Sequence, residues 1–276
     1  MDSKERDLPD FENPPLTEVA ISVQFDSLPD LQTPQIGLLW SKFRDRFPKT
    51  EQHPPLDPII EKFGPPSQPS IRLEISNAPP APRCWFLNEA GSELIQIQLD
   101  RFTHNWRKVK QEDEYPRYGH VRKQFSEELT EFCKFLQGEG LGEFRPNQCE
   151  VSYINHIGPG DVWNTHGQLG QVLTVWSPQY SDDFLSEPES TRIAMQHVFN
   201  NDEGDPIGRL HISTQPAFSA ADNRPILVMN ITARGVPADP SSEGVLAFVD
   251  RGREMIVRGF TSITTSEMHK VWRRIR

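Results

Sequence analysis

The sequence predicts an α+β fold in which helices pack on a curved antiparallel sheet. Several segments with alternating apolar and polar residues follow one another with no helix between them, which indicates antiparallel pairing. The polar positions in these segments, such as Gln96 and Gln98, are typical of a sheet with one solvated face. The expected order is β-α-β-β-β-α-β followed by β-β-β-α-α, which differs from the regular alternation of a βαβ nucleotide-binding fold.

The chain begins with a strand and a helix. Apolar residues alternate with small or polar ones along 19–25, which predicts a strand. Thr33 and Pro34 suit the N-cap and the first position of a helix, and Pro48 ends that helix. The proline-rich residues 51–69 predict irregular structure.

A meander of strands is expected next, at 71–75, 83–87 and 93–106. The residues NEAGS at 88–92 are typical of a hairpin loop, so the strands on either side of them are expected to pair.

A long helix and another strand follow the meander. The helix is expected after Tyr118 and to end at Gly138 or Gly140. One stripe of apolar residues runs along it: Val121, Phe125, Leu129, Phe132 and Leu136. Residues 149–157 predict the next strand.

The last third repeats this pattern. A short helical turn is expected at 171–176, and strands at 191–199, 208–214 and 225–233. Pro240 and Ser241 begin a long helix, and Thr264 and Glu267 match a capping box for a final helix.

We expect residues 1–13 to form a polar tail and 14–276 to form a single α+β unit. The order of strand, helix and meander occurs in both halves of the chain. The alternative is therefore two intimately packed halves, 14–157 and 158–276.

The composition indicates a globular protein with a substantial core. The chain has 276 residues, with 16 Phe and 6 Trp to form that core and 25 Pro to interrupt its elements. A net charge of −10 disfavours general binding to nucleic acid or anionic membranes. The three cysteines, in no metal or disulfide spacing, and the charged N-terminus predict a cytoplasmic protein with free thiols.

Four blocks and the terminal helix near HKVW carry a family resemblance: PPLTEVAISVQF, GSELIQIQLDRFTHNWRK, YPRY and CEVSYINHI. Over nearly its whole length, the chain resembles a sporadically distributed family of uncharacterised bacterial proteins of about this length. The resemblance implies an intracellular bacterial protein that forms one full-length unit. It supplies no catalytic residues.

No motif for a known reaction or cofactor is present. The P-loop, the dinucleotide-binding GxGxxG, GxSxG, HExxH and EF-hand patterns are all missing, so we expect no cofactor. His104, His120 and His156 have no metal-ligand spacing, and we expect no metal site.

The strongest polar cluster lies at two predicted strand ends. It consists of Asp100, Arg101, Asn105, Tyr153, Asn155 and His156. Tyr153 and Asn155 share one face of their strand, and the cluster converges if the strands 93–106 and 149–157 are neighbours. Phenol and amide groups suit ligand binding more than acid–base catalysis.

A basic stretch with aromatic residues overlaps this cluster. Residues 101–123 carry seven lysines or arginines against three acidic residues, with Trp106, Tyr115 and Tyr118 between them. Arg101, Trp106, Arg117 and Tyr118 would form a surface for single-stranded nucleic acid if they were exposed together.

We therefore expect a non-enzymatic binding or regulatory module for a protein partner, with a role in defence or in mobile elements as one setting. The alternatives are a small-molecule enzyme at the 100–106 and 153–156 strand ends and a single-stranded nucleic-acid binder, the latter not favoured. No membrane partner is expected, and the oligomeric state does not follow from the sequence.

Overall fold

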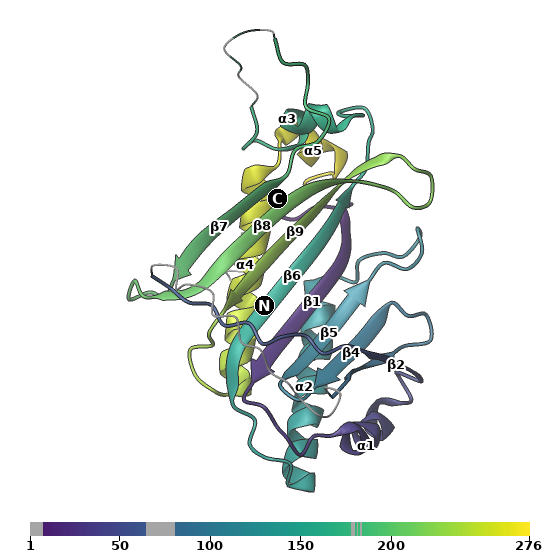
Figure 1. Ribbon diagram of the computed structural model, residues 1–276, viewed down its shortest axis with the longest axis vertical. Coiled ribbons are helices and arrows are strands. Elements are labelled where there is room, and N and C mark those ends of the chain that lie inside the picture. Colours follow the sequence, from purple (N-terminus) through teal and green to yellow (C-terminus); the bar gives the residue numbers. More distant parts are fainter. Residues whose placement is uncertain (1–7, 65–80, 178–179, 181, 183) are drawn as a thin grey trace.

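Within the described residues, a single nine-stranded antiparallel sheet forms the centre of the protein, and its long helices cover one face (Figure 1). The computed structural model describes residues 8–64, 81–177, 180, 182 and 184–276. The strand order is β2-β3-β4-β5-β1-β6-β9-β8-β7. The predicted α+β class, with helices on a curved antiparallel sheet, is confirmed.

Two successive sets of elements build the sheet. The first comprises β1 (Leu16–Phe25), α1 (Thr33–Phe43), β2 (Lys49–His53), β3 (Arg83–Leu87), β4 (Glu93–Gln98), β5 (Arg101–Arg107) and α2 (Tyr118–Glu139). The second comprises β6 (Pro146–Ile157), η2 (His166–Gln168), α3 (Leu169–Val172), β7 (Ile193–Asn200), β8 (Pro206–Phe218), β9 (Pro225–Gly235), α4 (Ser242–Ile263) and α5 (Ser266–Val271).

The two sets share one topology. In each, a long strand is followed by a short helix and then by a meander whose last strand returns to pair with the first. Each then places a helix of 22 residues across the same face of the sheet. The leading strands, β1 and β6, pair with each other at the centre. In this arrangement the second set begins at β6, before the expected division at residue 157.

The core lies between the sheet and the helices α2 and α4. Phe125 and Phe132 of α2 are fully buried, and the Phe132 ring lies 5.2 Å from that of Phe102 in β5 and 5.6 Å from that of Phe25 in β1. These contacts bury the apolar stripe that predicted the helix. Among the described helices, none combines the length and the apolar character needed to span a bilayer.

Several helix ends follow the local signals, although α1 has Gln32 and not Thr33 as its N-cap and ends at Phe43, before Pro48. Gly140, with φ of 66°, forms the C-cap of α2, as predicted. Ser241 caps α4 by accepting a hydrogen bond from Gly244 N. The capping box at Thr264 is wrong by one residue, because Thr265 is the N-cap of α5 and the Thr264 hydroxyl donates to Phe260 O instead.

Two strand predictions in the meander are wrong. Residues 49–53 form the edge strand β2, although most of them were expected to be irregular. Residues 93–106 are not one strand: a two-residue turn at Leu99 and Asp100 divides them into the hairpin β4–β5. Two backbone hydrogen bonds fix this turn: Phe25 N at the end of β1 donates to Asp100 O, and Leu28 N in the following loop donates to Leu99 O. The strand expected at 71–75 lies outside the described residues.

Residues 8–13, which belong to the expected polar tail, lie against the C-terminal end. Ile275 N donates to Asp10 O, and Asn13 N donates to Trp272 O. The Phe11 ring is buried and makes an edge-on contact with Phe260 of α4 at 5.5 Å. This contact brings the two ends of the described chain to one place above α4.

Candidate functional site

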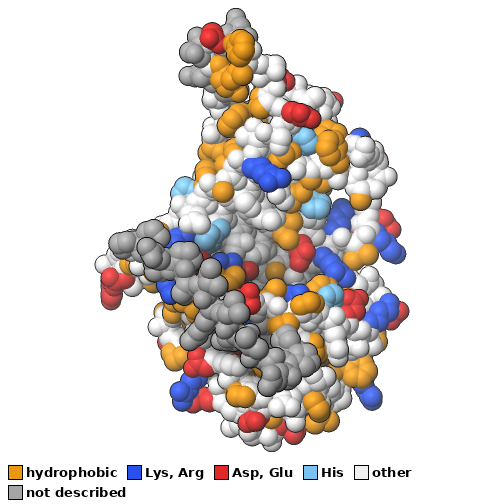
Figure 2. Space-filling model, in the orientation of Figure 1, with side chains coloured by type: hydrophobic (Ala, Val, Ile, Leu, Met, Phe, Trp, Pro, Cys, Tyr) orange, Lys and Arg blue, Asp and Glu red, His pale blue; other side chains and the backbone are white. Residues whose placement is uncertain are grey.

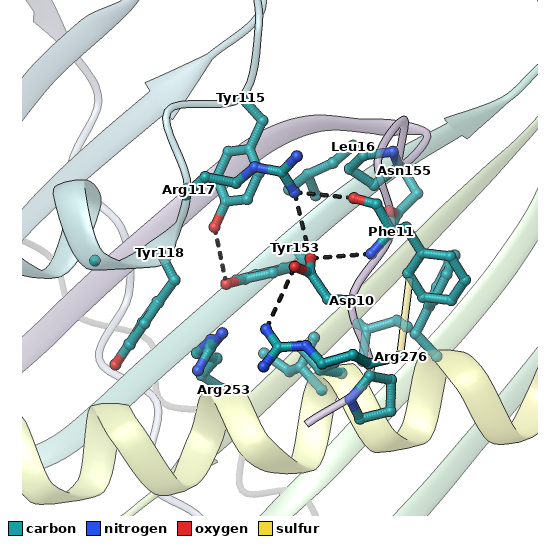
Figure 3. Close-up of a pocket in the computed structure, with 17 residues that line it drawn as sticks. Asp10, Phe11, Leu16, Tyr115, Arg117, Tyr118, Tyr153, Asn155, Arg253 and Arg276 are labelled. Atoms are coloured by element: carbon teal, nitrogen blue, oxygen red, sulfur yellow. Dashed lines mark hydrogen bonds and ion pairs between the residues drawn. The ribbon is translucent and has the colours of Figure 1, made fainter. Parts of the chain in front are cut away.

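A cavity of about 450 Å³ lies between the sheet, helix α4 and the N-terminal segment (Figure 3). Strands β1, β6 and β9 form its floor, and the loop before α2 forms a second wall. Its lining consists of Pro9, Asp10, Phe11, Pro14, Leu16, Tyr115, Arg117, Tyr118, Gly119, Tyr153, Asn155, Ile231, Arg253, Ile256, Val257, Phe260 and Arg276.

Three tyrosines form the polar part of the interior. Tyr153 extends from β6 towards the helices, because odd-numbered residues of this strand face the core. Its hydroxyl lies 3.2 Å from that of Tyr115. The Tyr115 ring is in turn packed against Trp106, with centroids 5.3 Å apart. The Tyr118 hydroxyl points out of the cavity and donates to Asp250 at 2.5 Å.

Arg117 closes one side of the cavity. It precedes α2 with φ of 70°, a conformation that few non-glycine residues adopt. Its guanidinium donates to Phe11 O at 2.9 Å and to Glu12 O at 3.2 Å, and it forms an ion pair with Asp10. Such strain is found where surrounding contacts fix the backbone, and here those contacts tie the N-terminal segment over the cavity.

Two further arginines face the cavity from distant parts of the chain. Arg253 of α4 lies over the Tyr118 ring at 4.4 Å, and it also interacts with the Tyr153 hydroxyl. Arg276, at the C-terminal end, lies 3.5 Å from Asp10. Among the described residues of the lining, three arginines therefore face a single acidic side chain, Asp10.

Burial keeps the tyrosines uncharged. It raises the pKa of Tyr115 well above its ordinary value, with a further contribution from Tyr153. Burial also raises the pKa of Tyr153, although the Arg253 guanidinium opposes the shift. The pKa of Tyr118 rises because of burial and then because of the neighbouring Asp250 carboxylate. The three phenols are thus neutral hydrogen-bonding groups and not bases.

This arrangement predicts that Tyr115, Tyr118 and Tyr153 stay protonated in the native protein at pH 10.0, the ordinary phenol value. Because the folded pKa values are raised, the contribution of these tyrosines to the free energy of unfolding is fully present below that pH. It is lost as the pH rises through the folded pKa values. Ultraviolet absorbance of tyrosinate, compared between native and urea-denatured protein, measures the effect. A native signal at pH 10.0 that disappears in Tyr153→Phe would contradict the assignment.

Four of the residues expected at a site line this cavity: Arg117, Tyr118, Tyr153 and Asn155. Tyr153 and Asn155 share a strand face, as the period of two predicted. Asn155 also donates to Met229 O at 3.3 Å, which fixes its side chain beside the floor.

The remaining expected residues do not join them. Strand β1 lies between β5 and β6, so the strands 93–106 and 149–157 are not neighbours, and the condition for the polar cluster to converge is not met. After the turn at Asp100, even-numbered residues such as Phe102 face the helices, whereas odd-numbered residues did so before it. Arg101 and Asn105 therefore lie on the face opposite the helices. His156 lies on that face too, because it is one residue from Asn155.

Trp106 and the basic stretch are likewise divided. The Trp106 ring faces the helices and is buried. Arg122 is bound to Asp250 through both carboxylate oxygens, at 2.6 and 2.8 Å. The expected nucleic-acid surface of Arg101, Trp106, Arg117 and Tyr118 is therefore not one continuous face.

The histidines are also separate. His104 is buried beside Glu128, and His120 pairs with Glu93. Within the described parts of the chain, no three His, Cys, Asp or Glu side chains gather as metal ligands would.

Sequence reasoning missed Arg253, Arg276 and the N-terminal residues. Arg253 lies within a charged run of α4, where an arginine is usually solvent-exposed. The basic C-terminus has a sufficient explanation in the dipole of the last helix. No local signal connects residues 10 and 276, since only the folded chain brings them together.

Comparisons with protein-family models, with curated proteins and with solved structures each returned no match.

Proposed function

We propose that the protein is a non-enzymatic binding module whose cavity holds a small organic anion with an apolar body. One observation carries this proposal: three arginines and two mutually hydrogen-bonded tyrosines line one cavity together with apolar side chains of β1, β9 and α4. Arginine binds carboxylate and phosphate groups through paired N–H donors, and neutral phenols add further donors.

The dimensions fit such a ligand. Small-molecule sites occupy roughly 300–1,000 Å³, and this cavity holds about 450 Å³. Its apolar surface comes mainly from Phe11, Leu16, Ile231, Ile256 and Phe260. The aliphatic or aromatic part of the ligand would be buried against these side chains, and its acidic group would lie among the arginines.

The lining favours binding over catalysis. Among the described residues that form it, none is a histidine, cysteine, lysine or glutamate. The tyrosines have raised pKa values, and Asp10 is paired with two arginines. A general acid or base needs a pKa near the working pH, and the buried tyrosines, whose pKa values are raised, do not supply one.

A regulatory role is part of the same proposal. The residues that close the cavity, Asp10 and Phe11, also join the two ends of the chain. A bound anion would compete with Asp10 for Arg117 and Arg276 and so alter this junction. The bacterial and intracellular setting, and a role in defence or mobile elements, belong to the proposal through the family resemblance alone.

Replacing Arg253 by methionine should weaken anion binding strongly while leaving the fold intact. We expect benzoate and phenyl phosphate to raise the Tm of the natural chain, and inorganic phosphate to raise it less, because it buries no apolar surface. Loss of a charged hydrogen bond of about 1.5–3 kcal/mol corresponds to a roughly 10- to 100-fold loss of affinity. Thermal shift and titration calorimetry with the same three anions provide the measurement.

Arg258→Met is the matched control, since Arg258 lies on the same helix, is paired with Glu254 and does not line the cavity. It should bind the anions as the natural chain does. Equal binding by Arg253→Met, or equal binding of the neutral benzyl alcohol, would reject the proposed function.

A further inference from the structure

A second binding surface lies on the opposite face of the sheet, independent of the cavity. Residues 54–64 (PPLDPIIEKFG), here called the strap, cross this face without regular secondary structure, as the dark blue trace in front of the strands in Figure 1 shows. Lysine, arginine and histidine side chains lie across the middle of the same face (Figure 2).

Sheet side chains bind the strap through its backbone. Gln98 donates to Leu56 O at 2.9 Å and accepts from Leu56 N at 3.0 Å, which reproduces the pairing of a β-ladder. Gln24 accepts from Ile59 N at 2.9 Å, and Gln148 accepts from Glu61 N at 3.1 Å. Arg101 donates to Asp57 O at 3.1 Å. Hydrogen bonds to the main chain do not depend on the side chains of the bound segment, so they can bind any extended segment that follows the same course.

One side chain of the strap is specifically recognised. Glu61 is buried, and its carboxylate contacts Arg209, lies 2.5 Å from His211 and lies 3.3 Å from Arg234. Without the strap, this face would present Arg101, Arg209 and Arg234 near the carboxylates of Glu150 and Asp100, a local excess of positive charge in a chain of net charge −10.

Three apolar side chains of the strap remain partly exposed to solvent. Leu56, Ile59 and Ile60 are 40%, 42% and 47% exposed. A segment that served only to complete the fold would be expected to bury such side chains. The strap is instead attached by its main chain, one carboxylate and the Phe63 ring, which lies 5.2 Å from the Arg209 guanidinium. Extended peptides are bound by receptors through main-chain contacts and a few side chains in the same way.

The fit beneath the strap is also incomplete. A void of about 10 Å³ lies under Ile59. Within the described residues, Arg101 Nε and Gln148 Nε2, which border this void, have no hydrogen-bond partner. These unused donors would serve an occupant with additional acceptors.

We propose that this face, lined by Gln24, Gln98, Gln148, Arg101, Arg209 and Arg234, is the docking site for an extended segment of a partner protein. That segment carries a glutamate in the place of Glu61. Residues 54–64 occupy the site within the chain until the partner displaces them. The charge of the site selects the acidic residue, and the glutamines bind the backbone around it.

The test uses a fluorescein-labelled peptide with the sequence of residues 54–64. Its binding is measured by anisotropy with the full natural chain and with the full-length variant Glu61→Ala. We expect Glu61→Ala to bind the peptide at least about 10-fold more tightly than the natural chain, in which the strap competes at high effective concentration. Glu143→Ala, which removes an exposed carboxylate paired with Arg145, should behave as the natural chain does.

Two changes should remove binding by Glu61→Ala: adding Arg209→Met to the protein, or replacing the glutamate of the peptide by alanine. Retained binding in either case overturns the proposal. No binding by a folded Glu61→Ala also overturns it. Dimerisation of Glu61→Ala by light scattering would assign the site to a second copy and likewise overturn the assignment to a partner.

Amide hydrogen exchange of the natural chain provides a test that needs no variant. The amides of Leu56, Ile59 and Glu61 should exchange through local opening, much faster than those of β1, although all are hydrogen-bonded. Exchange of the strap only on global unfolding would show a fixed structural segment and reject the proposal.

Discussion

Replacing Glu128 by alanine should lower the free energy of unfolding by about 1–3 kcal/mol, the usual cost of leaving a buried hydrogen-bonding group without its partner. Glu128 of α2 is 1% exposed and His104 of β5 is fully buried, and His104 Nδ1 lies 2.7 Å from Glu128 Oε2. Within the described chain, His104 Nε2 has no hydrogen-bond partner, so the side chain of His104 makes its hydrogen bond through Nδ1. Alanine would leave both ring nitrogens buried without partners. Urea unfolding followed by circular dichroism measures the change.

The control for this prediction is Arg46→Ala. Arg46 donates to the other carboxylate oxygen of Glu128 at 3.0 Å, but its side chain is 45% exposed. Such a pair contributes about 0–1 kcal/mol, so the variant should be nearly as stable as the natural chain. Glu128→Gln should lie between the two. A loss below about 1 kcal/mol for Glu128→Ala would show that the His104 contact does not stabilise the fold.

Phe132→Ala should cost about 3–5 kcal/mol, the range for deleting a buried aromatic ring. The Phe132 ring is fully buried between α2 and the sheet, with rings of Phe25, Phe102 and Phe144 within 6.4 Å. These neighbours come from β1, β5 and the loop after α2, so they cannot all move to fill the space. Urea unfolding again provides the measurement.

Phe184→Ala is the matched control, because Phe184 is 88% exposed and its loss removes no core packing. Its unfolding free energy should stay within about 0.5 kcal/mol of that of the natural chain. Similar losses in the two variants would mean that packing around Phe132 is not the source of the effect.

The two proposed sites lie back to back on one sheet, and strand β6 contributes to both. Its odd-numbered residues Tyr153 and Asn155 line the cavity beneath the helices. Its even-numbered residues Gln148 and Glu150 lie on the strap face. The period of two along a strand is sufficient to give one element two functional faces.

Part of the cavity was predictable because it depends on a single strand. The alternation along 149–157 placed Tyr153 and Asn155 on one face, and that relation needs no knowledge of neighbouring strands. Arg117 and Tyr118 were found because they lie in a local cluster of basic and aromatic residues. The strap site was not foreseen, since a proline-rich segment such as 51–69 has no period to indicate what it contacts.

Strand pairing was the point at which sequence reasoning failed. Odd-numbered residues of β4 face the helices, but after the hairpin turn at Asp100 the even-numbered residues of β5 do so. The alternation of residues 93–98 does not predict this change. The insertion of β1 between β5 and β6 separates the two strands whose contact would have brought the polar cluster together. The first of these features is a turn between strands that are adjacent in the chain, and the second concerns strands that lie far apart in it.

The sequence by itself determined the α+β class, the long helices α2 and α4, and caps such as Gly140 and Ser241. These features depend on contacts within one turn or one strand, so the local pattern of apolar residues is sufficient to specify them. The tertiary structure alone decided the strand order and the cavity, where Asp10 meets Arg276. It also placed Glu61 among Arg209, His211 and Arg234. Those groups lie far apart in the chain and meet only through packing and charge interactions in the folded protein. Local sequence patterns do not indicate such contacts.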